Sequence, residues 1–375
     1  MTVLEGKEDV LPEPELLEEV IWQERDFEAQ MTKDIFAWEY SDMNGLDPKF
    51  YQHKIYLKPD AVPVKQHSYR MNPNLAKQDK VEIDRLLQVG FITPIDNSKW
   101  LSPIVVAPKK NKKIRICVDY RKLNAAISAP FSLPFLDSIL DDFAGHKMYS
   151  FLDGFSGYNQ IRMAQEDQAK IAFIMARRVF ACTVMWFGLR NAPSTFQRDM
   201  FEIFGPYLTH FMWIFLNDLS VFGAQLEHLK QLQLCFLKCW EVNFSLNTLK
   251  CVFAMHSGRL LGHVIFEDGI SMDPDKIAAI MEAPAPVNSK QCAIFLSQTQ
   301  WHGRHLRFVA HLAIPTNQAA HAKIFEWTSE CDLAYRRLKI QLSKAPIMIS
   351  PNWDRDFHVF MDASNSAVGS VLMQE

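Results

Sequence analysis

The spacing of apolar residues predicts helices in two long segments of the chain. Residues 74–89 and 226–243 place apolar side chains at helical intervals, and Gly90 follows the first segment as a typical helix stop. Ile104–Pro108 and Ile114–Val118 are instead continuous apolar runs, as expected for paired strands. The pattern therefore predicts a mixed fold in the α+β class.

Two further apolar segments carry carboxylates. Tyr149–Tyr158 is an apolar strand pattern that contains Asp153 and the glycines at 154 and 157. Phe211–Phe222 predicts a β-hairpin whose polar turn is formed by Asn217 and Asp218, residue types that tolerate positive φ. Aspartates on rigid strands, distant in sequence but close in space, are suited to binding Mg²⁺, which prefers oxygen ligands.

The rest of the chain predicts a succession of further segments. Five are expected: an acidic tail over 1–34, an extended lead-in over 35–70, a strand pair over 258–270, proline-broken helices over 272–350 and a hairpin over 357–373.

The charge of the chain gives limited information about the class of partner that it binds. The 375 residues carry a net charge of −3, so the whole chain does not indicate a polyanionic ligand. Residues 58–122, however, hold fourteen Lys and Arg against six Asp and Glu, and Lys109–Lys113 forms the tip of the first predicted hairpin. Charge alone leaves two interpretations open, a phosphate-binding surface and an ordinary solvated face.

Seven cysteines without paired spacing favour reduced thiols in an intracellular chain. Cys235, Cys239, Cys251 and His256 could form a zinc set, but Cys235 and Cys239 lie four apart in an apolar helical pattern and are expected to face the core. No run of 18 apolar residues predicts a transmembrane helix, and the acidic start does not resemble a signal peptide.

Six motifs in order resemble the pol polyprotein of gypsy-type LTR retrotransposons, of the kind common in plants. The resemblance runs from about Phe36 through reverse transcriptase into the start of a ribonuclease H domain. The motifs are Val118–Asn124, Phe151–Ile161, Phe187–Arg198, Phe215–Asp218, Leu246–Cys251, and Leu261–His263 with Asp268–Ile270.

This resemblance implies a reverse-transcriptase fold of fingers, palm and thumb, then a connection region and a truncated ribonuclease H-like start. Its expected boundaries are 35–270 for fingers, palm and the start of the thumb, 271–350 for thumb and connection, and 351–375 for the last segment.

The resemblance also implies the catalytic residues. Two Mg²⁺ ions, with Mn²⁺ as an alternative, would be held by Asp153 and Asp218 and would stabilise the attacking and leaving oxygens of nucleotidyl transfer. Asn217 stands where the family has another aspartate. An amide has no formal charge, so this substitution is expected to impair catalysis.

Further site residues follow from the same resemblance. Tyr158 would exclude a 2′-hydroxyl from the nucleotide pocket. Leu261, Gly262 and His263 would grip the primer end, and Asp362 would be the first ribonuclease H metal ligand, without activity because further ligands are missing. The other implied nucleotide-binding residues are Lys109, Lys110, Arg115, Arg121, Phe187, Gly188 and Lys250.

The expected function is RNA-directed DNA synthesis from deoxynucleoside triphosphates on an RNA or DNA template with primer. Trp186 and Arg178 replace the proline and glycine usual in the family, near the expected nucleotide pocket. The alternative is a non-catalytic, decayed retroelement fragment that at most binds nucleic acid. A metal-dependent nuclease would also use clustered aspartates, but it does not explain Phe187–Arg198. No membrane partner is expected, the location is cytoplasmic or nuclear, and the oligomeric state is open.

Overall fold

A computed structural model describes residues 33–69, 73–108, 114–128, 136–175, 178–306, 309–349, 355–363 and 368–374. The chain forms two units. The first comprises residues up to 134 together with 150–221 and 229–252, and the second comprises 135–149, 222–228 and 253–375.

A five-stranded sheet in the first unit has the strand order β3-β9-β8-β4-β5. Helix α2 (Pro73–Gln88) contacts both β3 and β5, and it ends just before Gly90, whose φ is +70°. The predicted helix and its stop are therefore confirmed, as is the antiparallel pairing of β4 with β5. The strands are β3 (Ile92–Ile95), β4 (Ser102–Pro108), β5 (Ile114–Val118), β8 (Phe173–Met175) and β9 (Arg178–Cys182).

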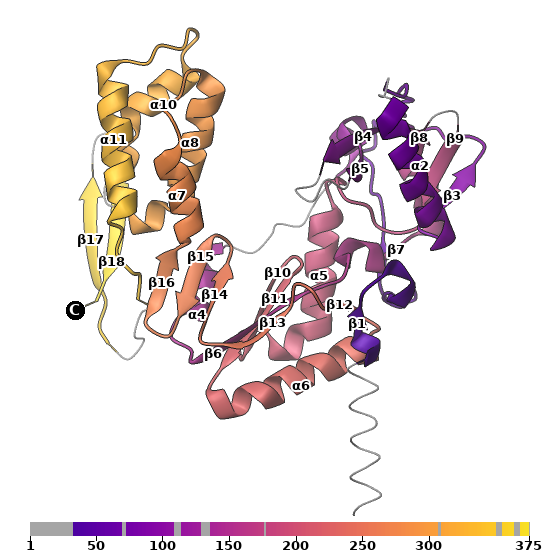
Figure 1. The fold of residues 1–375 in the computed structure, drawn as a ribbon, viewed down its shortest axis with the longest axis horizontal. Helices are drawn as coiled ribbons and strands as arrows, with labels where there is room; N and C mark the ends of the chain where they lie inside the picture. The colour runs from indigo at the N-terminus through magenta and orange to yellow at the C-terminus, as the bar shows by residue number, and fades with distance from the viewer. Residues whose placement is uncertain are drawn as a thin grey trace, which may run out of the picture. The chain divides into compact units, whose positions relative to one another are not determined.

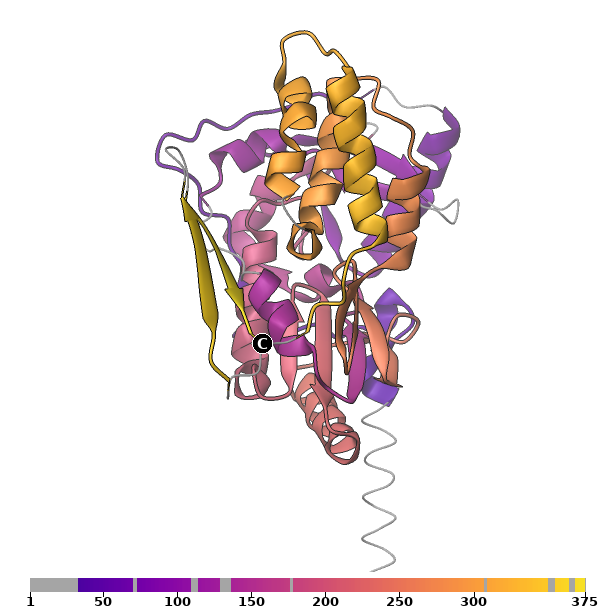
Figure 2. The ribbon, with the colours of Figure 1, turned by 90° about the vertical axis from the view of Figure 1, so that its left-hand side faces the viewer.

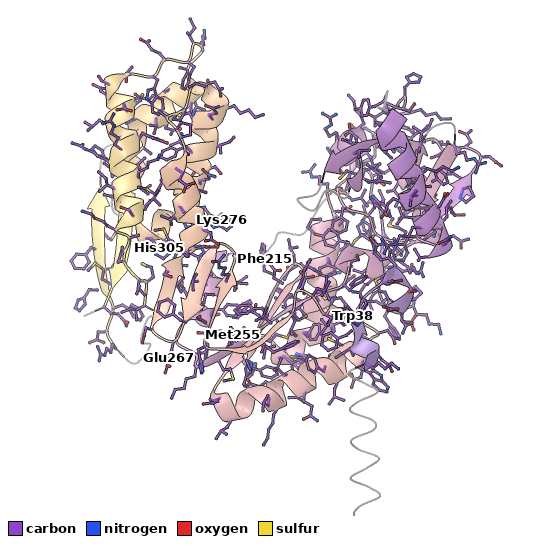
Figure 3. All side chains as sticks on the ribbon, in the orientation of Figure 1. Trp38, Phe215, Met255, Glu267, Lys276 and His305 are labelled. Carbon is purple, nitrogen blue, oxygen red and sulfur yellow. The ribbon has the colours of Figure 1, made fainter. Side chains whose placement is uncertain are left out.

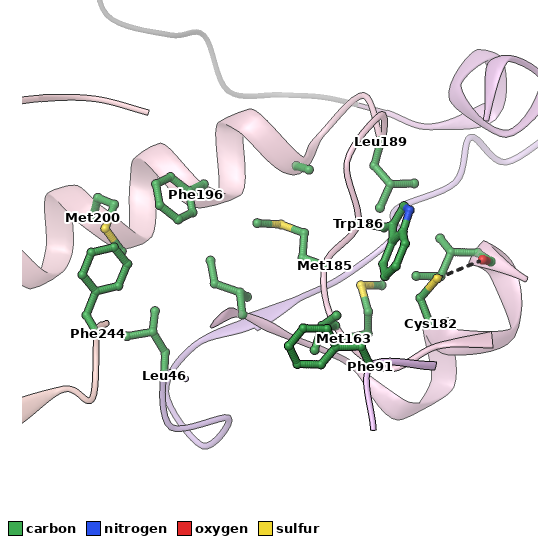
Figure 4. Close-up of a cluster of buried hydrophobic side chains, with 14 of the residues drawn as sticks. Leu46, Phe91, Met163, Cys182, Met185, Trp186, Leu189, Phe196, Met200 and Phe244 are labelled. Carbon is green, nitrogen blue, oxygen red and sulfur yellow. Dashed lines mark hydrogen bonds between the residues drawn. The ribbon is translucent and has the colours of Figure 1, made fainter. Parts of the chain in front are cut away.

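A second sheet has the order β10-β11-β6-β13 and carries the candidate site. Its strands are β6 (Met148–Asp153), β10 (Met212–Phe215), β11 (Asp218–Gly223) and β13 (Val252–Met255). Helix α5 (Ala192–Phe204) contacts β10. Phe196 and Met200 of this helix are fully buried in the core with Phe244 (Figure 4). Helix α6 (Gln225–Glu241) confirms the second helical prediction.

Short elements complete the first unit. Strand β1 (Phe36–Ala37) pairs in parallel with β12 (Leu246–Asn247), and β2 (Gln52–His53) pairs in parallel with β7 (Arg162–Met163). The other short elements are η1 (Tyr40–Asp42), α3 (Arg121–Ala126), η2 (Gly157–Gln160), η3 (Gln165–Ile171) and η4 (Gly205–Tyr207).

The second unit contains a three-stranded antiparallel sheet of β14 (Ser257–Leu260), β15 (His263–Phe266) and β16 (Gly269–Met272). The sequence predicted only a strand pair here. The third strand exists because two tight turns, rather than one, interrupt the segment.

Helices form the rest of the second unit. Helix α10 contacts α8 and α11, and α11 also contacts α7, so these four helices lie side by side (Figures 1 and 2). Phe295, Tyr335 and Leu338 are buried between them. The elements are α4 (Leu136–Phe143), α7 (Pro274–Glu282), α8 (Ser289–Trp301), η5 (Gly303–His305), α9 (Val309–Leu312), α10 (Ile314–His321) and α11 (Ser329–Ser343).

The last two strands confirm the predicted C-terminal hairpin: β17 (His358–Ala363) pairs antiparallel with β18 (Val368–Met373). Within the described ranges, no helix has both the length and the apolar character needed to cross a bilayer.

Candidate active site

The hairpin of β10 and β11 presents a two-residue turn. Phe215, which ends β10 (Figure 3), pairs with Asp218, so the turn consists of Leu216 and Asn217. Leu216 has a φ of +52°, a strained value for a bulky residue. The prediction of an Asn217–Asp218 turn is therefore wrong by one residue, because Asp218 already belongs to the strand ladder.

Gln197 on α5 holds this turn from behind. Its Oε1 accepts a hydrogen bond from the Leu216 amide at 2.6 Å, and its Nε2 donates to the Ile214 carbonyl at 2.9 Å. The side chain is fully buried, so both bonds form away from water. The sequence offered one signal that was missed: Gln197 precedes the apolar residues Met200 and Phe201 by three and four positions, so it shares their face of the helix.

Asp153 ends β6, and its side chain is 17% exposed. The segment after it approaches the hairpin closely because glycines follow. A Cβ at Gly157 would lie only 2.1 Å from Asn217 Oδ1, and one at Gly154 would lie 2.7 Å from the same atom. These glycines therefore leave room for the side chain of residue 217.

Asn217 uses one end of its amide and leaves the other unpaired. Its Nδ2 donates to the Gly154 carbonyl at 3.0 Å. Its Oδ1 is buried and has no hydrogen-bond partner among the residues that the structure describes. A buried oxygen without a partner is unfavourable and marks a place where a further group could bind.

Lys250 lies at Asp153. Its Nζ is 3.1 Å from both carboxylate oxygens of Asp153. A tight turn positions the lysine: the Lys250 amide donates to the Asn247 carbonyl, and the Asn247 side chain accepts from the Leu249 amide. The Leu246–Cys251 motif thus brings a cation to the carboxylate at the end of β6.

Both aspartates have raised pKa values. Burial raises the pKa of Asp153, and hydrogen bonds from Lys250 and Asn217 oppose the rise. Desolvation by the surrounding protein also raises the pKa of Asp218, and the charge of Asp153 raises it further. The two carboxylates therefore interact, and the protein alone does not fully stabilise their charged forms.

The oxygens of these side chains are of the kind that binds a divalent cation. Two coupled carboxylates and the unpaired Asn217 oxygen are hard oxygen donors of the kind that Mg²⁺ prefers. Among the residues that the structure describes, however, no group of three or more His, Cys, Asp or Glu side chains could hold a metal ion.

Comparison with known proteins identifies the domain. Residues 107–265 match the family model for reverse transcriptase (RNA-dependent DNA polymerase), and 327–375 match that for the RNase H-like domain found in reverse transcriptase. The chain is 32% identical to the retrovirus-related Pol polyprotein from transposon 412 of Drosophila melanogaster, over 91% of this chain and 28% of that protein.

The chain carries a reverse transcriptase domain of the retrotransposon Pol polyprotein type. It is also 26% identical to the Tf2-3 transposon polyprotein of Schizosaccharomyces pombe, over 92% of this chain and 26% of that protein. The chain therefore spans between a quarter and a third of the length of these relatives.

Solved structures show the same fold. The foamy viral protease-reverse transcriptase dRH in complex with double-stranded DNA is similar with a TM-score of 0.79 and 19% identity, covering 97% of this chain and 66% of that one. The complex of the foamy viral enzyme with an RNA/DNA hybrid gives 0.78 and 19%, covering 99% and 54%. The predicted reverse-transcriptase fold is confirmed.

Three aromatic residues of the reverse transcriptase domain, Tyr158, Phe187 and Phe196, lie in contact. The Tyr158 ring stacks on Phe187 at 4.9 Å between centroids and contacts Phe196 at 5.2 Å. Phe187 is half exposed, so the stacked pair reaches the surface. Gly188 has a φ of +95°. Asn124, which the sequence reasoning gave no role, holds this turn by donating to the Gly188 carbonyl and accepting from the Arg190 amide, each at 2.8 Å.

The structure describes the basic candidate residues to different extents. Lys109 and Lys110 lie outside the described residues, and only the backbone of Arg115 is described, opposite Ala107. Arg121 forms an ion pair with Asp119, at 2.6 Å. That pair and a hydrogen bond from Tyr69 hold the pKa of Asp119 well below its usual range.

The candidate primer-grip residues belong to the second unit. Leu261 and Gly262 form the turn between β14 and β15, with φ values of +50° and +81°. The Leu261 carbonyl accepts from the Trp301 indole at 3.0 Å. His263, by contrast, is buried against His302 and His305, each at 5.4 Å between ring centroids, so its side chain serves the core of the unit.

Several other residues singled out in the sequence have structural roles or are described only in part. Trp186 is buried beside Phe173 in the core (Figure 4), so its bulk is absorbed by packing, and Arg178 is exposed at the start of β9. Cys235 and Cys239 are fully buried, which confirms their core-facing prediction. Of Asp362 the structure gives only the backbone register, opposite Gly369.

Proposed function

We propose that this chain is the polymerase part of a gypsy-type LTR retrotransposon Pol polyprotein, and that its reaction is RNA-directed DNA synthesis. The observation that carries the proposal is the coupling of Asp153 with Asp218 beside the Lys250 ammonium. Two interacting carboxylates with raised pKa values on adjacent strands of one sheet are suited to binding a divalent cation.

Each residue has a role in this proposal. Asp153 and Asp218 would hold Mg²⁺ or Mn²⁺, which supplies charge stabilisation to a transferring phosphate. Lys250 would offset negative charge on the triphosphate once a metal ion competes for Asp153. Tyr158, which stacks on the half-exposed Phe187, would border the sugar of the incoming deoxynucleotide.

The substrates follow from this chemistry. A primer paired with an RNA or DNA template and deoxynucleoside triphosphates are the expected ligands. The foamy viral relatives are described in complex with double-stranded DNA and with an RNA/DNA hybrid, which supports a nucleic-acid duplex as a ligand here.

Asn217 is expected to lower the rate of this copy. Replacing a charged ligand by an amide that donates to the Gly154 carbonyl removes one negative charge from the site. Each 1.36 kcal/mol of lost transition-state stabilisation reduces the rate about tenfold. The same observation favours the second candidate function, a nucleic-acid-binding fragment without catalysis.

Primer extension on an RNA template tests the proposal. We expect slow extension in Mg²⁺ that is abolished by Asp153→Asn and unaffected by Asp60→Asn, which changes an exposed carboxylate elsewhere in the first unit. Extension that survives Asp153→Asn would refute the site. If the unmodified chain and Asn217→Asp both bind primer–template without extending it, the non-catalytic alternative is correct.

A further inference from the structure

A pocket in the first unit lies on a face of α5 that does not contact the β10–β11 hairpin. It has a volume of about 230 Å³ and is formed by the 48–56 segment together with Thr195 and Arg198 of α5. Thr195 and Arg198 are three apart and share one helix face, whereas Gln197 contacts the β10–β11 hairpin.

Hydrogen bonds fix the two walls of this pocket to each other. The buried His53 ring lies 2.9 Å from the Thr195 hydroxyl through Nδ1. Asn191, just before α5, donates from its amide to the Lys54 carbonyl at 2.9 Å. The Ile55 amide donates to the buried Asp167 carboxylate at 2.8 Å. The pocket is therefore a preformed feature of the fold.

The pocket is positively charged. Within the described residues, neither the Lys49 nor the Lys54 ammonium has an ion-pair partner. Arg198 also lines the pocket and pairs with the buried Asp199 carboxylate at 2.9 Å. The two lysines thus place positive charge at the pocket that no carboxylate among the described residues offsets through an ion pair, and an anionic ligand would do so.

Two exposed aromatic rings stand beside these cations. Phe50 is 77% exposed and Tyr56 is 57% exposed, and both line the pocket. The two rings together expose apolar surface next to the lysines, and grouped exposed apolar surface of this kind is found at ligand-binding sites. Cations that follow a phosphate backbone and aromatic rings that stack on bases are the usual combination for binding single strands.

We propose that this pocket binds a phosphodiester group and the adjoining base of a single-stranded nucleic acid. Lys49 and Lys54 would contact the phosphate, and Tyr56 or Phe50 would stack on the base. The site would be a second anchor for the strand on which the proposed polymerase acts, and in that sense it rests on the proposed function. Its binding chemistry, however, involves neither Asp153 nor Asp218.

The salt dependence of binding tests the phosphate contacts. A fluorescein-labelled oligothymidylate is titrated with the full chain in EDTA, and its anisotropy is followed at several salt concentrations. Each phosphate contact to a single strand contributes about 0.7 to the log–log slope, so Lys49→Gln with Lys54→Gln should make the slope shallower by about 1.4. The matched control, Lys99→Gln with Lys230→Gln, removes two exposed lysines elsewhere and should leave the slope unchanged.

Two aromatic variants test stacking. Tyr56→Leu should weaken binding of the oligonucleotide about fivefold or more, because stacking of one base contributes about 1–3 kcal/mol. Tyr56→Phe keeps the ring and should restore the affinity of the unmodified chain. Circular dichroism of every variant shows whether the fold is intact, and Tyr56 is exposed enough for both changes to be accommodated.

Three results would overturn the proposal. One is an equal change of slope for the pocket and control pairs. Another is an equal loss of affinity for blunt duplex DNA. The third is loss of thymidine monophosphate binding without any change for the oligonucleotide, which would assign the pocket to a free nucleotide. Because metal is absent, failure here leaves the primer-extension result intact, and failure of primer extension leaves this binding result intact.

Discussion

The Lys250 ammonium lies 3.1 Å from each carboxylate oxygen of Asp153. A divalent cation bound at Asp153, as proposed, would therefore compete with this lysine for the same carboxylate. The lysine side chain is 60% exposed, so the pair contributes little stability and can separate at low cost.

Removing this competitor should strengthen metal binding. We expect Lys250→Gln to lower the dissociation constant for Mn²⁺ by up to about fivefold, because exposed ion pairs contribute about 0.2–1 kcal/mol. Calorimetric titration of Mn²⁺ into the metal-free chain measures the change. Lys230→Gln, an exposed lysine on α6, is the control. Unchanged affinity would show that Lys250 does not restrict Asp153.

Restoring the acid at position 217 should make stability depend on metal. Asn217→Asp loses the hydrogen bond to the Gly154 carbonyl and places a charge against it, so unfolding in EDTA should be easier by about 1–3 kcal/mol. Added Mg²⁺ should recover this loss, and primer extension should rise at least about tenfold.

Urea unfolding of the Asn217→Asp chain with EDTA and with Mg²⁺ gives the two free energies. Asn44→Asp adds the same charge at an exposed position and should show no metal dependence. A variant that Mg²⁺ does not stabilise would rule out residue 217 as a ligand position.

Tyr158 distinguishes sugar selection from packing. Its ring stacks on Phe187 and is proposed to border the sugar, so Tyr158→Val in the Asn217→Asp background should raise ribonucleotide use relative to deoxynucleotide use. The measurement is the ratio of the two kcat/KM values, and Tyr158→Phe, which keeps the ring, should leave that ratio unchanged. Equal slowing of both substrates would mean that the tyrosine only packs.

Asp199 should give stability a pH dependence. Burial raises its pKa from 3.8 to about 6, with Arg198 opposing the rise. A carboxyl group with a raised pKa in the folded state stabilises the protein below the unfolded pKa, and this contribution is lost as pH rises through about 6.

The Asp199→Asn chain removes this titration. The unfolding free energy of Asp199→Asn minus that of the unmodified chain should therefore rise by about 2–3 kcal/mol between pH 4 and pH 7. Urea unfolding of both proteins at each pH gives the difference, in which groups common to both cancel. A difference that does not vary with pH would place the Asp199 pKa near its ordinary value.

Local pattern was enough to predict much of this fold. Helix α2, the β4–β5 pair and the β10–β11 hairpin follow from apolar spacing and from stop residues such as Gly90, because these signals lie within each segment. The proximity of Asp153 and Asp218 followed from the motif resemblance, and the raised pKa of Asp218 agrees with it.

What the sequence could not give depends on distant partners. The turn residues were misplaced because Gln197, about twenty positions earlier, holds Leu216 at positive φ. The burial of the His263 ring against His302 and His305, which come from another segment, was also not predictable from the sequence around it. Such contacts are tertiary, and no window of neighbouring residues contains them.

The way in which Gln197 holds the turn has an evolutionary consequence. Because both of its hydrogen bonds end on backbone atoms at 214 and 216, the shape of the turn does not depend on whether an amide or an acid stands at 217. The scaffold can therefore persist while the chemistry is lost. Asparagine and aspartate codons differ by a single base, so one transition in the gene would return a carboxylate to a turn that is still held in place to receive it.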